Sequence, residues 1–239
     1  MSIDTSNKRN RLLQSEQQGK LFFSAYLQKK GYSNQLLKRY RSSGWLESLS
    51  KGVMYRTGGQ LRSFGAIASY NEQMGKCLHV GAHSALELSG FSHFVPMGRP
   101  LLMVGHPVSE VPPNWLRTKP QFFNRIEEGF EIAIAAPEQA FLECLLLTPT
   151  HYTYMDLYYI MEQLTTLRPE VLQSMLENTD NLKVKRMFLY MAQKAGHYWF
   201  EMLDKSKIYL GTSKYQLSKN GVYIPEYKIT VPKELYDYE

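Results

Sequence analysis

Histidines able to bind a metal ion gather in one part of the 239-residue chain, where His79, His83, His93 and His106 make up four of its six histidines. A zinc site needs three or four ligands that converge with suitable geometry. His79 and His83 are expected to flank a turn between a strand and a helix, and the chain has no His-Glu-x-x-His pattern. We therefore predict structural or capping roles for these histidines, no metal site and no cofactor.

A second pattern, Glu226-Tyr227-Lys228, has the Glu-x-Lys spacing of many metal-dependent nucleases. There the carboxylate holds a divalent cation and the lysine steadies the attacking water. Such a site also needs an acidic ligand on a neighbouring strand, and Asp204 is the only nearby candidate. Because a three-residue pattern arises often by chance, an ordinary strand edge is favoured and a nuclease is the alternative. Phosphate-loop and Gly-x-Ser-x-Gly motifs are absent from the sequence, so we predict that the protein is not an enzyme.

A third kind of chemistry, hydrogen bonding to bases and phosphates, fits the stretch from Tyr32 to Thr57. Ser33 is placed to cap a helix, and Ser43-Gly44 is placed to end it. One face of this helix suits a core and comprises Leu36, Leu37 and Tyr40. Two short strands then flank the tight turn Ser50-Lys51-Gly52. This pattern predicts a DNA-reading helix followed by a β-wing. The alternative is a surface helix and a hairpin that do not bind DNA.

The positive charge of the chain lies in the same N-terminal part. Residues 1–60 carry eleven Lys and Arg against three Asp and Glu, which gives +8, whereas residues 61–150 carry −2 and residues 151–239 carry zero. A segment of this charge attracts polyanions. The side chains predicted to contact DNA are Ser33, Asn34, Gln35, Lys38, Arg39, Arg41, Lys51 and Arg56, together with Lys8, Arg9 and Arg11.

These residues require a helix-turn-helix with a wing, and helices are accordingly expected over Lys8–Ser15 and Leu21–Lys30 ahead of the capped helix. Beyond Gly58-Gly59, strands alternate with helices, including a hairpin and a helix over Pro137–Leu147. The predicted hairpin consists of Phe122–Ile126 and Phe130–Ala135. Later helices are expected over Tyr154–Leu164, Pro169–Glu177 and Leu182–Ala195. The predicted C-terminal strands are Ile208–Leu210, Gln216–Leu217 and Val222–Ile224, with a tight hairpin at Asn220-Gly221 and a last strand through Tyr227, Ile229 and Val231.

The expected fold class is therefore α+β. It comprises an N-terminal winged helix-turn-helix, a small mixed α/β middle region and a helical C-terminal region that ends in a short β-sheet. We place the domains at residues 1–59, 60–148 and 149–239, where the last two can pack as one domain. Cys77 and Cys144 lie far apart and are expected to be buried thiols. With no membrane-length apolar run and no signal-peptide pattern in residues 1–18, a cytoplasmic location is expected.

The predicted helix Leu182–Ala195 has a second stripe of polar side chains beside its apolar one. The stripe comprises Lys183, Arg186, Lys194 and, if the helix continues past Gly196, His197. Residues 180–219 carry eight Lys and Arg against three Asp and Glu, a local +5. An ordinary solvated helix face and a basic surface for an acidic partner are equally consistent with this pattern.

Beyond these patterns, nearly the whole chain resembles one family through three groups of motifs. In the N-terminal part they are Gly31-Tyr32-Ser33, Ser43-Gly44-Trp45-Leu46 and Lys51-Gly52-Val53-Met54-Tyr55. In the middle they are the run from His79 to Gly90 and Ala136-Pro137-Glu138. In the C-terminal part they are Leu167-Arg168-Pro169-Glu170, Val184 to Tyr190, Ala195 to Phe200, Ile208-Tyr209-Leu210-Gly211 and Tyr227 to Pro232. The chain thus resembles the AbiEi family, the antitoxins of type IV toxin–antitoxin and abortive-infection systems, which act in phage defence.

This resemblance implies a winged domain that binds inverted repeats in its own promoter and represses its operon. It also implies a C-terminal region that counters a nucleotidyltransferase toxin without forming a stable complex with it. Where relatives tend to have Gly-Ser-Gly-Lys-Arg, this chain has Gly211-Thr212-Ser213-Lys214-Tyr215 and so lacks one basic residue. The predicted surface for this second activity is the stripe of Lys183, Arg186, Lys194 and His197. A repressor without a toxin partner is the remaining alternative.

Overall fold

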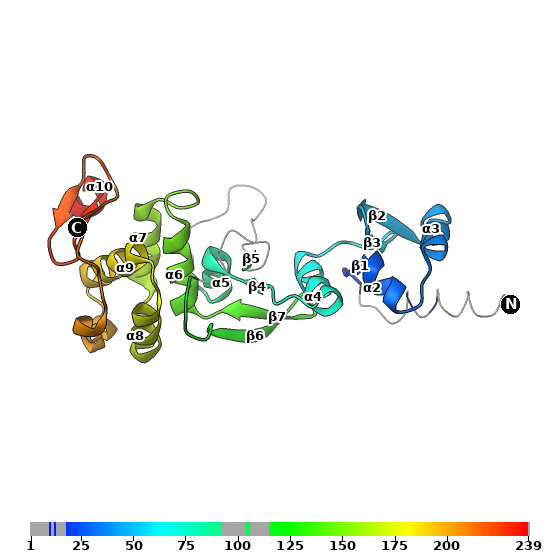
Figure 1. The fold of residues 1–239 in the computed structure, drawn as a ribbon, viewed down its shortest axis with the longest axis horizontal. Coiled ribbons are helices and arrows are strands. Elements are labelled where there is room, and N and C mark those ends of the chain that lie inside the picture. Colours follow the sequence, from blue (N-terminus) through cyan, green and yellow to red (C-terminus); the bar gives the residue numbers. More distant parts are fainter. Residues whose placement is uncertain (1–9, 11, 13–17, 92–103, 106–114, 239) are drawn as a thin grey trace. The chain divides into compact units, whose positions relative to one another are not determined.

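The computed structural model describes residues 10, 12, 18–91, 104–105 and 115–238 of an α+β protein (Figure 1). The chain forms two compact units, described separately below. Unit 1 comprises Met1–Leu78 and Asn124–Ala133, and unit 2 comprises His79–Phe123 and Ile134–Glu239. These units are bounded differently from the three domains expected from the sequence, and the division at residues 59 and 148 stays a prediction.

Unit 1 begins with the elements of a winged helix-turn-helix. They are β1 (Leu21–Phe23), α2 (Ser24–Lys29), α3 (Asn34–Ser42), β2 (Leu46–Ser50) and β3 (Val53–Arg56). The three strands form one antiparallel sheet in the order β1-β3-β2, in which the wing hairpin β2–β3 pairs with β1. This order agrees with the winged pattern expected from the sequence.

The predicted helix over Leu21–Lys30 is wrong in its first three residues, which form β1. All three side chains of the Leu-Phe-Phe run are buried, and a continuous apolar run of this kind suits a strand covered on both faces. Helix α2 therefore begins only at Ser24. The helix predicted over Lys8–Ser15 lies outside the described residues, apart from Asn10 and Leu12.

Helix α4 (Ser63–Met74) supplies hydrogen-bonding partners to the edge of β1 that no described strand pairs with. The Leu21 amide donates to Ser69 Oγ at 2.9 Å, and the Phe23 amide donates to Gln73 Oε1 at 2.9 Å. Gln73 Nε2 in turn donates to the Leu21 carbonyl at 2.7 Å. Side-chain amide and hydroxyl groups thus take the place of a fourth strand and leave this edge closed to pairing with another chain.

The predicted hairpin is present as β6 (Phe122–Glu127) and β7 (Phe130–Ala135), with Glu128 and Gly129 at positive φ in its turn. It belongs to a sheet of order β5-β4-β7-β6 with β4 (His79–Val80) and β5 (Val104–Gly105). Helix α5 (Ala82–Leu88) follows β4. Of the two cysteines, both free, Cys144 is buried as predicted, whereas Cys77 is exposed and contradicts the prediction.

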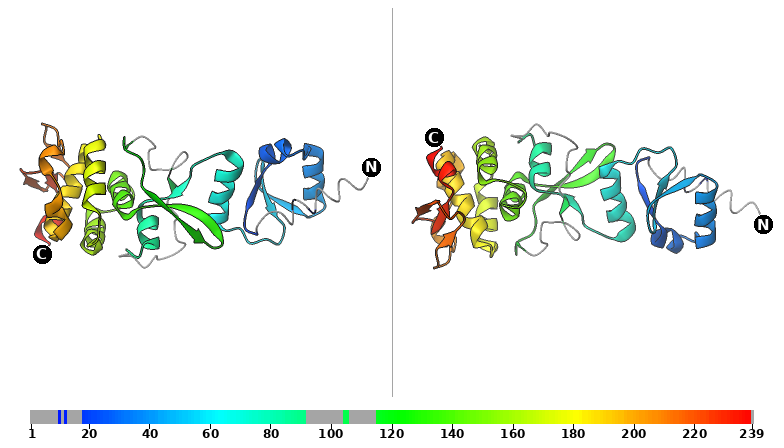
Figure 2. Two further views of the ribbon diagram at one scale, coloured as in Figure 1. Left: turned by 90° about the horizontal axis from the view of Figure 1, so that it is seen from below. Right: turned by 90° about the horizontal axis from the view of Figure 1, so that it is seen from above.

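Most of unit 2 is helical, and its helices agree closely with the expected bounds. They are α6 (Pro137–Leu147), α7 (Tyr154–Gln163), α8 (Pro169–Asn178) and α9 (Leu182–Ala195). Figures 1 and 2 both show α9 between α6 and the C-terminal segment. Glu138 of α6 accepts hydrogen bonds from Arg168 Nε at 3.0 Å and Nη2 at 2.9 Å, just ahead of α8. Burial opposes ionisation of Glu138, but these bonds outweigh it and lower the pKa of the carboxyl group.

The C-terminal segment ends in a three-stranded sheet that differs in topology from the expected one. Its strands are β8 (Tyr215–Gln216), β9 (Val222–Ile224) and β10 (Ile229–Val231), followed by α10 (Lys233–Asp237). Their order is β8-β10-β9, with β10 parallel to β8 and antiparallel to β9. The tight hairpin predicted at Asn220-Gly221 is therefore wrong, because β10 lies between the two strands that this turn connects.

The strand predicted over Ile208–Leu210 is also wrong. The carbonyl groups that would form its ladder accept hydrogen bonds from α9 side chains instead. Lys185 Nζ donates to the Tyr209 carbonyl at 3.2 Å, and Arg186 Nε donates to the Leu210 carbonyl at 2.9 Å. In contrast, Tyr227, Ile229 and Val231 are all buried, as the alternation in the sequence predicted.

Candidate nucleic-acid interface

Helix α3 has the cap and the two faces that its sequence predicts. The Leu36 amide donates to Ser33 Oγ at 3.2 Å, so this hydroxyl positions the first turn. Leu36, Leu37 and Tyr40 are buried in the core of unit 1, whose other members include Met54 of the wing. Packing on this core turns the polar face to solvent, where Asn34, Gln35, Lys38, Arg39 and Arg41 are all exposed.

The exposed face of α3 has much of its hydrogen-bonding capacity free. Asn34 Oδ1 accepts from Gln28 Nε2 at 2.9 Å, which leaves the Asn34 amide hydrogens for another partner. Among the residues that the structure describes, no carboxylate pairs with Lys38 or Arg39. Arg41 lies further round the helix, with Nη1 at 3.9 Å from the sulfur of Met54.

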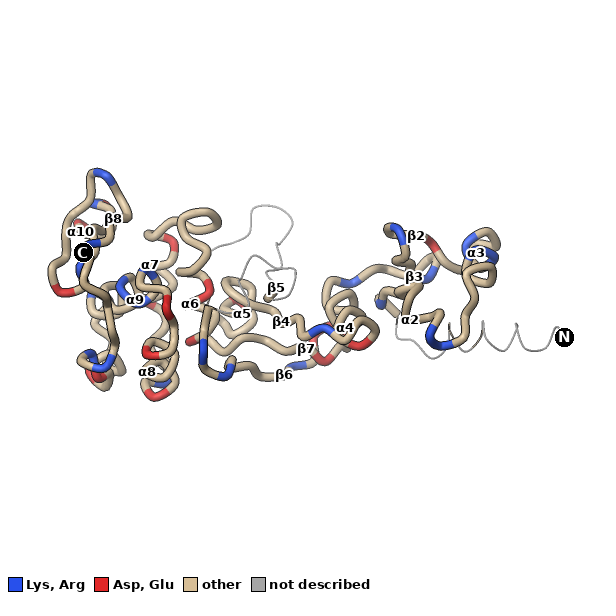
Figure 3. Tube along the Cα trace, viewed as in Figure 1, with Lys and Arg blue, Asp and Glu red and all other residues tan. Residues whose placement is uncertain are grey.

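The wing is fixed to the helix-turn-helix at its tip. The Ser24 amide, at the start of α2, donates to the Gly52 carbonyl at 2.8 Å. Gly52 has φ 79°, a conformation that favours glycine, and it places the exposed Lys51 at the turn. Arg56 is exposed at the other end of β3. Figure 3 shows cationic positions on α3 and at the end of the β2–β3 hairpin.

The exposure of Leu49 in the wing was not predicted from the sequence. The β2–β3 register shifts between Ser48 and Ser50, so Leu49 lies in a β-bulge with 53% of its surface exposed. The signal was present, since Leu46 and Leu49 are three positions apart and cannot share a strand face in regular alternation. Lys8, Arg9 and Arg11, the other predicted DNA contacts, lie outside the described residues.

The basic stripe expected on α9 is not an exposed surface. Arg186 is fully buried, and its guanidinium donates to the carbonyls of Leu210, Ser213 and Lys228. Burial also lowers the pKa of Arg186. His197 is buried too, and its Nε2 donates to the Met161 carbonyl at 2.6 Å. The prediction of a basic surface is therefore wrong for these two residues.

The other two members of the stripe also bond to backbone carbonyls. Lys183 Nζ donates to the carbonyls of Leu146 and Thr148, and burial lowers its pKa. Lys194 Nζ donates to the carbonyl of Tyr238, which ties α9 to the end of the described chain. The structure thus uses this stripe to hold unit 2 together.

His79 is buried, and its imidazole is hydrogen-bonded to a carboxylate of α6. His79 Nε2 donates to Glu143 Oε1 at 3.2 Å, and this fully buried carboxylate also accepts from the Ala82 amide at 2.8 Å. Gln139 Nε2 donates to the same carboxylate at 2.8 Å. His83 is hydrogen-bonded to the Tyr152 hydroxyl at 2.7 Å, whereas His93 and His106 lie outside the described residues. No group of three His, Cys, Asp or Glu in the described part of the chain is arranged to hold a metal ion.

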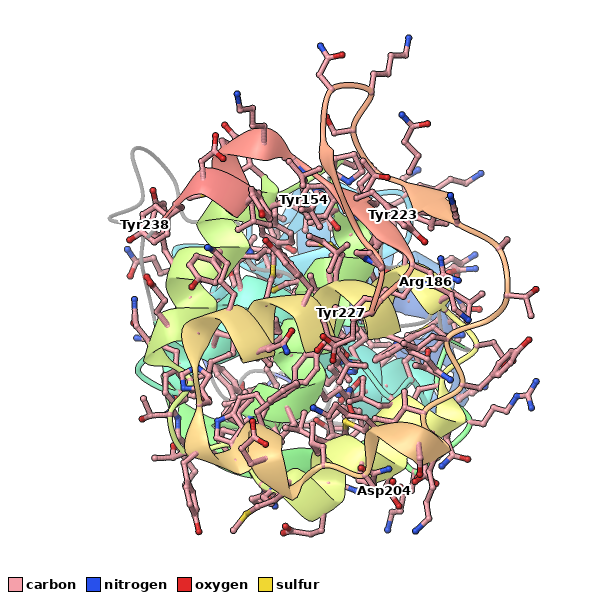
Figure 4. The ribbon with its side chains drawn as sticks, turned by 90° about the vertical axis from the view of Figure 1, so that its left-hand side faces the viewer. Tyr154, Arg186, Asp204, Tyr223, Tyr227 and Tyr238 are labelled. Atoms are coloured by element: carbon pink, nitrogen blue, oxygen red, sulfur yellow. The ribbon has the colours of Figure 1, made fainter. Side chains whose placement is uncertain are left out.

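The nuclease pattern is not assembled. Asp204 is exposed and pairs with Lys207, and Figure 4 shows it well apart from Tyr227, the central residue of the Glu-x-Lys pattern. Glu226 lies in the turn ahead of β10 and not on a strand, where it accepts from Gln193 Nε2 at 3.3 Å. Lys228 Nζ donates to the Gly211 carbonyl at 2.7 Å. The three side chains therefore do not converge on one site.

A winged helix-turn-helix with an exposed cationic helix is the arrangement of a class of DNA-binding transcription regulators. Two family comparisons place the chain within this class. The family "Transcriptional regulator, AbiEi antitoxin N-terminal domain" matches residues 5–97, and "Transcriptional regulator, AbiEi antitoxin, Type IV TA system" matches residues 104–232. The chain belongs to the AbiEi antitoxin family of transcriptional regulators of type IV toxin–antitoxin systems.

A solved structure shares this fold. The chain is similar to the RV2827C protein from Mycobacterium tuberculosis, with a TM-score of 0.62 and 15% sequence identity over 95% of this chain and 89% of that one. No curated protein matches the chain. Within the described residues, no helix is both long enough and apolar enough to cross a bilayer.

Proposed function

We propose that the chain represses its own operon by binding inverted repeats in the promoter, with α3 in the major groove and the wing against the backbone. The observation that carries this proposal is the two-sided packing of α3. Its apolar face is buried in the core, while Asn34, Gln35, Lys38 and Arg39 remain exposed on the opposite face and Arg41 is exposed further round the helix. Arginine, lysine, asparagine and glutamine are the residues that read base edges in the major groove.

The direct test is a titration of the full chain with duplex DNA from its own promoter and with a scrambled duplex of equal length. We expect tighter binding to the promoter, and two protected half-sites in a footprint, as the dimeric geometry of such sites requires. Equal affinity for both duplexes would contradict sequence-specific repression.

Lys51 should act as a phosphate contact, and not as a reader of bases. Changing Lys51 to Ala is expected to weaken binding to promoter and scrambled duplexes by the same factor. It should also reduce the slope of log affinity against log salt concentration by about one, because one fewer counterion is released. Titrations at several salt concentrations measure both quantities. Loss of affinity for the promoter duplex only would instead place Lys51 on a base.

We further propose that the chain is the antitoxin of a nucleotidyltransferase toxin, with which it forms no stable complex. Membership of the AbiEi antitoxin family supports this proposal. Its test is rescue of growth when the chain is expressed with a nucleotidyltransferase encoded beside it, using a heterologous promoter so that repression plays no part. Absence of rescue would favour a repressor without a toxin partner, and co-elution of the two proteins would contradict the absence of a complex.

A further inference from the structure

A stretch of the C-terminal segment is positively charged without any acidic residue. From Lys205 to Pro225 the chain has four lysines and no Asp or Glu. All four lysines are exposed. One of them, Lys207, pairs with Asp204, which precedes the stretch. The remaining charge is therefore open to a negatively charged ligand.

Cations also lie beneath this stretch. Lys185, Arg186 and Lys228 donate to carbonyls of residues 209–213 and, within the part of the chain that the structure describes, pair with no carboxylate. Carbonyl groups satisfy their hydrogen-bonding capacity but do not cancel their charge. The backbone at residues 209–213 is consequently held in place by three cationic side chains, and the exposed Lys214 follows directly after it.

The sheet next to this loop presents one aromatic and polar face. In the register of β8, β10 and β9, Gln216 lies opposite Thr230, and Thr230 lies opposite Tyr223, so these three share a face. Their neighbours Ile229 and Val231 are buried, which makes this the outer face. The ammonium of Lys214 lies 4.9 Å from the centre of the Tyr223 ring, and Tyr223 is 36% exposed. Figure 4 shows Tyr223 close to Arg186 on this side of unit 2.

We propose that this C-terminal platform binds single-stranded nucleic acid. It is formed by Gln216, Tyr223 and Thr230 on the sheet, by Lys214 beside Tyr223, and by the exposed Lys219 in the segment between β8 and β9. Proteins bind single strands by stacking bases on exposed aromatic rings and by placing cations along the backbone. The Tyr223 ring supplies the stacking surface, and Lys214 and Lys219 supply the phosphate contacts. A cation over an exposed ring is held weakly, so Lys214 can turn from Tyr223 to a phosphate when a base stacks there.

The aromatic ring is what favours a single strand over the other polyanions. In a duplex the bases are already stacked and paired, so none is available to stack on an aromatic ring at a sheet face. An acidic protein surface would use the lysines but would gain nothing specific from Tyr223. This inference is independent of the proposed duplex binding, because it concerns other residues in the other compact unit.

The test measures fluorescence anisotropy of a labelled oligoadenylate RNA with the full chain, with duplex DNA and polyglutamate as competitors. Tyr223→Ala is expected to weaken RNA binding about tenfold or more, and Tyr223→Phe, which keeps the ring, to leave it within about twofold. Lys214→Ala and Lys219→Ala should each reduce the salt dependence. Matched controls are Lys233→Ala and Tyr198→Ala, because both residues are exposed outside the platform, Tyr198 to 79%.

Unchanged RNA binding in Tyr223→Ala would overturn the proposal. So would a loss of RNA affinity in the control Tyr198→Ala that equals the loss in Tyr223→Ala. Competition by duplex DNA as strong as by unlabelled RNA would show a second duplex contact instead, and stronger competition by polyglutamate would show an acidic-protein surface. Arg39→Ala should leave RNA binding intact while it weakens promoter binding, so failure of either function is detected separately.

Discussion

Replacement of Arg186 by methionine is expected to lower the free energy of unfolding by about 3 kcal/mol, because the change leaves buried carbonyl groups without a hydrogen-bond donor. The guanidinium joins α9 to three separate points of the C-terminal segment, the carbonyls of Leu210, Ser213 and Lys228. Methionine fills much of the same volume but donates no hydrogen bond. Urea unfolding followed by circular dichroism measures the loss as a lower midpoint with an unchanged slope.

Two variants separate this effect from a general loss of charge. Arg186→Lys keeps the charge but not the planar fork, so it should fall between wild type and methionine. Arg117→Met removes an arginine from the exposed pair with Asp180, whose side chains are 71% and 72% exposed, and should change stability by less than about 0.5 kcal/mol. An Arg186→Met variant as stable as Arg117→Met would show that the buried hydrogen bonds contribute little.

Sequence patterns predicted the helices of unit 2 well because their signals are local. Helix α6 starts at Pro137, which needs no amide partner at a first helical position, and α9 ends at Ala195, where Gly196 follows in the left-handed conformation. Within each helix, the spacing of the apolar residues indicated which face is buried. Helix α3 was predictable for the same reason, since its cap Ser33 and its core residues lie within one short segment.

The burial of Arg186 could not be predicted in this way. A cation at helical spacing among polar neighbours is typical of a solvated face. Its partners are backbone carbonyls at positions 210, 213 and 228, and carbonyl acceptors leave no mark on the amino-acid sequence. The same limit explains the missed topology of the last sheet, where β10 inserts between β8 and β9 through a non-local pairing.

In the candidate interface, the sequence predicted which α3 side chains are exposed, but not how the rest of unit 1 supports them. The closure of β1 by Ser69 and Gln73 of α4 depends on residues well beyond the winged pattern. The bulge that exposes Leu49, in contrast, lies within the winged pattern and follows from the β2–β3 register. The base contacts of α3 themselves stay a prediction, which the following variant tests.

Arg39→Ala is expected to weaken promoter binding by about 1–3 kcal/mol, or roughly five- to 150-fold, if this guanidinium reads a guanine. Arg39 is exposed on α3, and no carboxylate in the described residues competes for it. Its carbonyl accepts from the Ser42 hydroxyl at 3.1 Å, a bond that alanine retains, so the end of the helix should persist. Titration with promoter and scrambled duplexes gives the loss of affinity and the loss of specificity separately.

The decisive comparison is with Arg39→Lys. Lysine keeps the charge for a phosphate but cannot form the two parallel bonds that guanine accepts from arginine. If Arg39 reads a base, lysine should leave scrambled-duplex binding nearly unchanged and lose most of the preference for the promoter. If Arg39 contacts a phosphate, lysine should restore both affinities. The control for charge is Lys76→Ala, which removes an exposed charge of unit 1 beyond α4. If Lys76→Ala weakens promoter binding as much as Arg39→Ala does, α3 does not recognise the promoter.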